Sequence, residues 1–177
     1  GTPDVVLLCV KTYDLEAAAR QLSPILSEHS VIISLENGLD AESVIQNNIK
    51  AGTVFGGVAY IYANITAPGV ITEWNGPKKI AFGPLDGIIT KRAEEIHNAI
   101  ANAGINVELS ADIKTVLWKK FIFIAAGGGG VTAARLPLAN VLAVEESRTL
   151  FQDAMKEAIA IARAKGITIE PDLVEKQ

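Results

Sequence analysis

Two short apolar runs with an amphipathic stretch between them restrict the fold of this 177-residue chain more than any other feature. Residues 5–10 and 31–35 are runs of strand length without a charged side chain, as expected of parallel strands buried on both faces. Between them, residues 14–28 carry apolar side chains at helical spacing. The pattern predicts a β-α-β unit, in which a right-handed crossover joins two parallel strands.

The same α/β pattern continues to about residue 111. We expect, in order, a helix over 40–49, a strand over 54–62, two short antiparallel strands over 69–74 and 79–83 joined by a turn at 75–77, a helix over 91–103 and a strand over 105–109. Thr90 and Gly104 are suited to cap the two ends of the second of these helices.

The composition changes near Ala111, after which no strand pattern occurs until Ile167. We expect an apolar helix through Trp118 and Phe123, a break at the four glycines 127–130, a short helical segment over 137–144 and a long helix over 145–165 with Leu150 and Ile161 in its core face. The sequence therefore predicts an α/β domain over 1–111, followed by an all-α domain over 112–177.

Composition excludes several classes of protein. With 49% hydrophobic residues and a net charge of −4, the chain is too apolar and too weakly charged to be disordered. It has no basic run, so we expect neither nucleic acid nor an anionic membrane as a partner. Its single cysteine rules out a disulfide framework, and His29 and His97 are far apart in sequence, so we expect no metal. No signal peptide or membrane span is apparent, and we expect a cytoplasmic protein.

Two polar residues follow the two predicted parallel strands. Lys11 comes after the first strand and Asn37 after the second. Ligands of open parallel sheets bind beyond the carboxyl ends of the strands, and neighbouring strands lie about 5 Å apart, so these side chains can face one site. Taken separately, Lys11 is equally compatible with a surface cation, and Asn37-Gly38 is a common turn dipeptide. Cys9, in the first apolar run, is expected to be a small core residue.

Lys120 lies on an otherwise apolar helix face. Its neighbours one turn away are Val116, Leu117, Phe123 and Ile124. Removal from water disfavours the charged form of a lysine and shifts its pKa towards values useful for proton transfer. The alternative is that Lys119 and Lys120 lie at the rim of a packing face.

The four glycines at 127–130 lack the Gly-Lys-Ser/Thr ending of a phosphate-binding loop. Their backbone is accessible to close approach, either by another helix or by a ligand, and we favour helix packing. Arg135 follows this segment and could bind a carboxylate or lie at the surface.

Three sequence blocks occur together: DVVLLCVKT at 4–12, ENG at 36–38 and LWKKF at 117–121. In order and separation they resemble the 2-dehydropantoate 2-reductase (ketopantoate reductase) family. The resemblance implies a Rossmann-type parallel sheet domain followed by a helical domain, with the active site in the cleft between them. It further implies reduction of ketopantoate to pantoate with NADPH, in pantothenate and coenzyme A biosynthesis.

The resemblance also implies roles for individual residues. Lys11 and Asn37 match the family's lysine and asparagine near the nicotinamide and ribose of the cofactor, and Lys120 matches the catalytic lysine that protonates the substrate's carbonyl oxygen. The expected partner is a small 2-oxo acid, and we count a second copy of the chain, in a homodimer, among the candidate partners.

The chain departs from the family pattern in two respects. No Gly-x-Gly-x-x-Gly turn follows a strand, so we expect an internal fragment that lacks the glycine-rich half of the Rossmann domain and the C-terminal end. The family's substrate-binding asparagines are replaced by Ile124 and Gly128, and Arg135 is a substitute candidate for holding the substrate carboxylate. Two alternatives therefore stay open: a reductase of another 2-oxo acid, and a non-catalytic fragment that serves packing or self-association.

Overall fold

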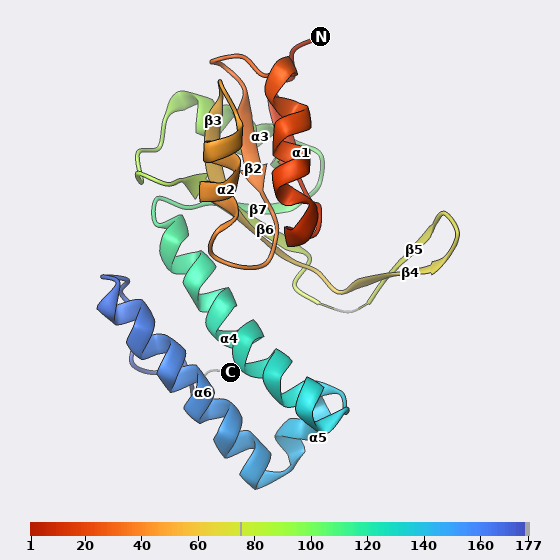
Figure 1. The fold of residues 1–177 in the computed structure, drawn as a ribbon, viewed down its shortest axis with the longest axis vertical. Coiled ribbons are helices and arrows are strands. Elements are labelled where there is room, and N and C mark those ends of the chain that lie inside the picture. Colours follow the sequence, from red (N-terminus) through yellow and green to blue (C-terminus); the bar gives the residue numbers. More distant parts are fainter. Residues whose placement is uncertain (75, 176–177) are drawn as a thin grey trace. The chain divides into compact units, whose positions relative to one another are not determined.

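The structure is a computed structural model that describes residues 1–74 and 76–175. The chain forms two compact units, Gly1–Ile113 and Lys114–Gln177, which are described separately (Figure 1). None of the described helices is long and apolar enough to cross a membrane.

The first unit is built on a mixed sheet. Within the described residues its strands have the order β1-β2-β3-β6-β7. The pairs β1–β2, β2–β3 and β6–β7 are parallel, and β3–β6 is antiparallel. The elements of this unit are β1 (Val5–Leu8), α1 (Leu15–Leu22), β2 (Val31–Ser34), α2 (Ala41–Asn48), β3 (Thr53–Tyr60), β4 (Ala63–Ala67), β5 (Val70–Glu73), β6 (Lys79–Pro84), α3 (Lys91–Asn102) and β7 (Asn106–Leu109), with short 3-10 turns at Thr12–Asp14 and Ser23–Ile25.

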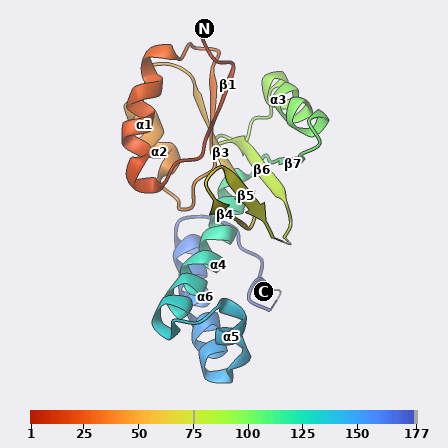
Figure 2. The ribbon, with the colours of Figure 1, turned by 90° about the vertical axis from the view of Figure 1, so that its right-hand side faces the viewer.

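Strand β2 is buried along its whole length because helices cover both faces of the sheet (Figure 2). Ile32 packs in a cluster with residues of α1 and α2, whereas Ile33 packs with residues of α3 on the opposite face. The predicted β-α-β unit with parallel strands is therefore confirmed. The predicted ends of α3 are confirmed as well, because the Thr90 hydroxyl accepts a hydrogen bond from the Ala93 amide and Gly104 adopts a φ of 81°.

The first strand is less buried than the sequence predicts. Because β1 lies at the edge of the sheet, Val5 and Val6 are half-buried and Leu7 is 47% exposed. The strand ends at Leu8, so Cys9 lies beyond it and is exposed. The expectation that Cys9 is a core residue is wrong.

The predicted pairing of residues 69–74 with residues 79–83 is also wrong. Strand β5 pairs with β4, a strand that the sequence analysis does not predict, and the resulting hairpin projects from the main sheet (Figure 1). Strand β6 instead pairs with β3 and buries Ala81 and Phe82 in the sheet. Burial of these two side chains favours a place inside the sheet over a local hairpin. The turn predicted at 75–77 includes Asn75, which lies outside the described residues.

The second unit is helical, with α4 (Ile113–Ala134), α5 (Leu138–Ala143) and α6 (Glu145–Ala164). Helix α4 runs through all four glycines, so the predicted break is wrong. The predicted close packing is confirmed. A Cβ atom at Gly127 would lie 3.6 Å from Phe151, and one at Gly130 would lie 3.3 Å from Val141. Gly127 and Gly130 thus let α5 and α6 approach α4, and this packing offsets the low helix propensity of these two glycines.

The buried face of α6 differs from the predicted one. Phe151, Met155 and Ile159 form its core face, whereas Leu150 is 68% exposed and Ile161 is 54% exposed. Both sets have helical spacing, and packing against α4 and against residues 167–174 decides which set is buried.

We expect opposite effects from alanine at two glycines. A Cβ atom at Gly83 would lie 2.0 Å from the Ser110 carbonyl oxygen, so Gly83→Ala should lower the free energy of unfolding by at least about 1–3 kcal/mol. Gly129 lies inside α4 with no atom within 4 Å of such a Cβ, so Gly129→Ala should raise that free energy by up to about 1 kcal/mol. Urea unfolding of both variants provides the measurement, and equal midpoints would contradict this account.

Candidate functional site

Lys11 and Asn37 occupy equivalent positions after neighbouring strands. Leu8 and Ser34 are paired in the parallel register of β1 and β2, and the Leu35 amide donates to the Leu8 carbonyl at 3.0 Å. Lys11 and Asn37 each come three residues after this pair. Both side chains are exposed beyond the carboxyl edge of the parallel strands, which is the edge where ligands of such sheets bind.

The backbone at both positions is defined by local turns. Lys11 is extended, with φ −77° and ψ 149°, and its carbonyl accepts a hydrogen bond from the Asp14 amide at 2.8 Å. Gly38 has a φ of 121°, a conformation that side-chain-bearing residues rarely adopt. The turn therefore requires the glycine of the Asn37-Gly38 pair, and Asn37 is the residue of the pair whose side chain can form hydrogen bonds.

A buried acidic cluster beside Asn37 was missed by the sequence analysis. Glu36 and Glu42 are each only 6% exposed, and the Ser34 hydroxyl donates to Glu36 Oε2 at 2.6 Å. Burial raises the pKa of both carboxyls. The only sequence signal is the spacing of Ile32, Ser34 and Glu36. These residues are two positions apart, so an extended chain places them on one face.

Lys120 is half-buried on α4. Burial lowers the pKa of its ammonium group below the ordinary value of 10.5, in the direction expected from its apolar neighbours. Lys119, the next residue, forms an ion pair with Glu170 at 2.8 Å. Burial thus makes the Lys120 proton easier to release than that of a lysine in water.

Ile124 and Gly128 share a helix face with Lys120, because α4 is continuous and the three residues are four positions apart. Ile124 is 36% exposed, and a Cβ atom at Gly128 would have no neighbour within 4 Å. Arg135 follows the last residue of α4, is exposed, and has a φ of 55°. It therefore ends the helix in the left-handed conformation usually taken by glycine.

The structure thus groups the predicted residues into two sets. Lys11 and Asn37 belong to the unit Gly1–Ile113, and Lys120, Ile124, Gly128 and Arg135 belong to the unit Lys114–Gln177. Within the described part of the chain, no group of three or more histidine, cysteine, aspartate or glutamate side chains could hold a metal ion.

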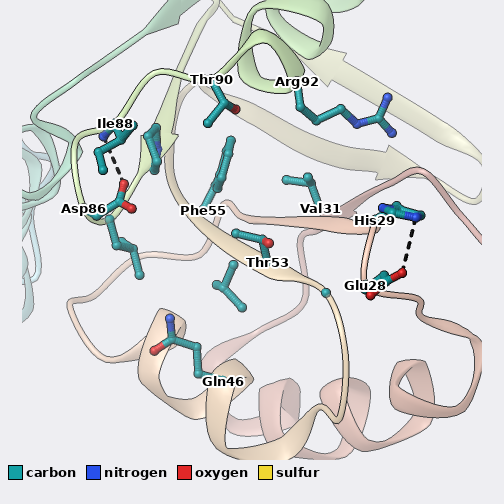
Figure 3. A pocket seen from close by; sticks show the side chains of 14 residues that line it. Glu28, His29, Val31, Gln46, Thr53, Phe55, Asp86, Ile88, Thr90 and Arg92 are labelled. Atoms are coloured by element: carbon teal, nitrogen blue, oxygen red, sulfur yellow. Dashed lines mark hydrogen bonds and ion pairs between the residues drawn. The ribbon is translucent and has the colours of Figure 1, made fainter.

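A cavity of about 640 Å³ occurs in the first unit at the start of β2 and β3 (Figure 3). Its lining includes Val31, Thr53, Phe55 and Arg92, and none of the predicted site residues. Since ligands of open α/β sheets bind at the opposite, carboxyl edge, we assign this cavity no role.

Comparison with known proteins identifies the family. Residues 1–87 match the family described as Ketopantoate reductase PanE/ApbA, and residues 112–177 match the C-terminal part of the same family. The chain belongs to the ketopantoate reductase family. An uncharacterized oxidoreductase of Bacillus subtilis, YkpB, is 29% identical over 99% of this chain and 58% of its own length. A 2-dehydropantoate 2-reductase of Halobacterium salinarum is 24% identical over 98% of this chain and 56% of its own length.

Solved structures show the same fold. The crystal structure of 2-dehydropantoate 2-reductase from Geobacter metallireducens matches with a TM-score of 0.88 and 28% identity, over 99% of this chain and 59% of that one. A D-mandelate dehydrogenase, solved with NADH and anilino(oxo)acetate, matches with a TM-score of 0.87 at 17% identity, over 99% of this chain and 56% of that one; it shows likeness of fold alone. The α/β unit is thus the C-terminal part of a Rossmann-type domain, followed by a helical part, and the chain spans little more than half the length of these relatives.

The lowered pKa of Lys120 predicts how stability changes with pH. Between its value in the folded protein and 10.5, the unfolded chain binds more protons at this residue than the folded chain does. The free energy of unfolding should therefore rise with pH in that window more steeply for the unmodified protein than for Lys120→Met. Urea unfolding at a series of alkaline pH values provides the measurement, and parallel pH profiles would contradict the prediction.

Proposed function

We propose that this protein reduces a 2-oxo acid with a nicotinamide cofactor, with Lys120 as the proton donor. The family's own reaction, reduction of 2-dehydropantoate to pantoate with NADPH, is our first candidate. The observation that carries the proposal is the half-buried Lys120 on α4, whose pKa is lowered by burial, in a chain of the ketopantoate reductase family.

Lys11 and Asn37 fit the nicotinamide end of the cofactor. A cationic and an amide side chain, both exposed at the carboxyl edge of parallel strands, can donate hydrogen bonds to ribose hydroxyls and to the carboxamide. The glycine-rich turn that binds the pyrophosphate in Rossmann domains does not occur within these 177 residues. When bound, the nicotinamide supplies the hydride. Our choice of NADPH over NADH follows the family resemblance.

Lys120 would supply the proton that the reduced carbonyl oxygen requires. Negative charge develops on this oxygen as the carbonyl carbon is reduced, and an ammonium group stabilises it before and during proton transfer from Nζ. Partial burial makes this proton easier to release than that of an exposed lysine.

The substrate is less closely defined by these residues. Ile124 and Gly128 stand where the resemblance places asparagines, and this difference favours the second candidate, a reductase of another 2-oxo acid. Arg135 is exposed, and its guanidinium is suited to bind the substrate carboxylate. We also propose a cytoplasmic location and a homodimer. A ketopantoate reductase from Staphylococcus aureus, 21% identical to this chain, is described as dimeric.

The proposal is tested on the complete gene product by following NADPH and NADH oxidation with ketopantoate and a panel of other 2-oxo acids. Lys120→Met should lower kcat by about 10²–10⁴-fold, the usual contribution of a general acid. Lys119→Met is the matched control, because it removes the adjacent lysine, and it should leave kcat unchanged. Equal activity of the two variants would exclude Lys120 as the donor, and absence of turnover with every oxo acid would favour a non-catalytic role.

The role of positions 124 and 128 is tested by restoring the family's side chains. The double variant Ile124→Asn, Gly128→Asn should raise kcat/KM for ketopantoate relative to other 2-oxo acids by about 10-fold or more, because each amide can bond a substrate hydroxyl. Gly129→Asn is the control, since it places the same side chain on another face of the helix. An unchanged preference in the double variant would show that these positions do not contact substrate.

A further inference from the structure

The face of α4 beside Lys120 is both exposed and apolar. Phe121, Ile124, Ala125 and Gly128 have the spacing i, i+3, i+4 and i+7, which places them on one face of the helix. Phe121 is half-buried, Ile124 is 36% exposed, and Ala125 and Gly128 are exposed. We call this set the apolar strip. Contiguous exposed apolar surface is typical of sites that bind a ligand or another protein.

The apolar strip offers a ligand no hydrogen bond. Residues 121–131 read FIFIAAGGGGV, and none of their side chains can donate or accept one. The backbone amides and carbonyls of this segment lie in the interior of α4, where they are taken up by the hydrogen bonds of the helix. At about 1.5 Å per residue the segment is about 16 Å long, which exceeds the length of a small 2-oxo acid.

Space for a ligand lies on the C-terminal side of Lys120. A Cβ atom at Gly128 would have no atom within 4 Å, so not even Ile124 fills this position. Helical side chains lean towards the N-terminus of their helix, so a side chain at 128 would cover the surface above Ile124, and glycine leaves that surface open. On the N-terminal side of Lys120, by contrast, Leu117 is buried and Val116 is half-buried.

The proposed reaction determines which part of a substrate meets the apolar strip. The carbonyl oxygen must lie at Lys120 Nζ to receive the proton. The carbonyl carbon of a 2-oxo acid carries a carboxylate and a side chain. A carboxylate on an apolar surface without a hydrogen-bond partner is costly, so the side chain is the part that lies along the strip. It then passes Ile124, about one helical turn from Lys120, and reaches the space at Gly128, about two turns away.

We propose that the substrate is a 2-oxo acid whose side chain is apolar, carries no hydroxyl group, and is long enough to pass Ile124 and fill the space at Gly128. These two residues then determine substrate specificity. This substrate class rests on the proposed function, because Lys120 as proton donor defines where the carbonyl lies. It also decides between the two substrate candidates, against ketopantoate, whose side chain ends in a hydroxyl group.

The apolar strip should act on substrates in two ways. A hydroxyl group placed on it loses its hydrogen bonds with water and gains none from the protein. An apolar surface rejects such a group only moderately, by about 10–100-fold. Each additional carbon that the strip removes from water favours the substrate instead. The value of kcat/KM should therefore rise with the apolar size of the side chain and fall when a hydroxyl group is added.

The unmodified protein can be tested with two substrates that differ in a single group. Ketopantoate and 3,3-dimethyl-2-oxobutanoate have the same carbon skeleton, and only ketopantoate carries a hydroxyl group. For the complete gene product, kcat/KM from oxidation of NADPH or NADH should be about 10–100-fold higher with 3,3-dimethyl-2-oxobutanoate. It should also rise about 10-fold from 2-oxobutanoate to 4-methyl-2-oxopentanoate, whose longer side chain buries more carbon on the strip.

Gly128→Leu tests the direction in which the side chain extends. The added side chain would occupy the open space above Ile124, so the ratio of kcat/KM for 4-methyl-2-oxopentanoate to that for 2-oxobutanoate should fall by about 10-fold or more. Gly129→Leu is the matched control, because this position also has no atom within 4 Å of an added Cβ but lies about 100° further round the helix. It should leave the ratio unchanged.

The possible outcomes distinguish this substrate class from the proposed function. Preference for ketopantoate over 3,3-dimethyl-2-oxobutanoate, or no dependence on side-chain size, would overturn the apolar substrate class and leave the reductase activity in place. This comparison needs no variant, so it decides the matter even where Gly128→Leu fails to fold. An equal loss of kcat/KM for every substrate in Gly128→Leu would show that protein, and not substrate, covers the strip, and would also overturn the proposal. Absence of turnover with every 2-oxo acid and both cofactors would overturn the proposed function, and the substrate class with it.

Discussion

Strand β2 is buried on both faces, and the arrangement of the α/β unit follows from covering it. Ile32 requires α1 and α2 on one side, and Ile33 requires α3 on the other. Once β2 is central, the parallel pairing with β1 brings Lys11 and Asn37 to equivalent positions at one edge. The same burial includes Ser34, at the end of β2, and extends to Glu36, so that the turn carrying Asn37 begins inside the core and ends in solvent.

Features of the fold with local causes could be predicted from the sequence. The apolar run of β2, the Thr90 cap and the left-handed Gly104 each specify their own conformation, and the structure has them where expected. Pairing between distant segments could not be predicted in this way. The partner of β6 depends on burial of Phe82 in the main sheet, and the buried face of α6 depends on where α4 lies.

The residues of the candidate site also differ in whether their positions have local causes or depend on distant segments. The shared edge of Lys11 and Asn37 follows from parallel topology, and the direction of the Lys120 pKa follows from apolar neighbours on its own helix. Glu36 and Glu42 gave no comparable signal, because acidic side chains in a turn or in the first turn of a helix are usually solvated. Their burial arises only when α2 packs on the sheet, so it required the structure.

The four glycines of α4 differ in what surrounds them. Gly127 and Gly130 are held close to α5 and α6, so larger side chains there would disturb the unit. Gly128 and Gly129 have no neighbours within 4 Å of an added Cβ. One helix thus carries both glycines that packing constrains and glycines that are open to mutation. The residue at 128 can therefore be exchanged without compensating changes elsewhere, and the exposed face of α4 around it can change in single, tolerated steps.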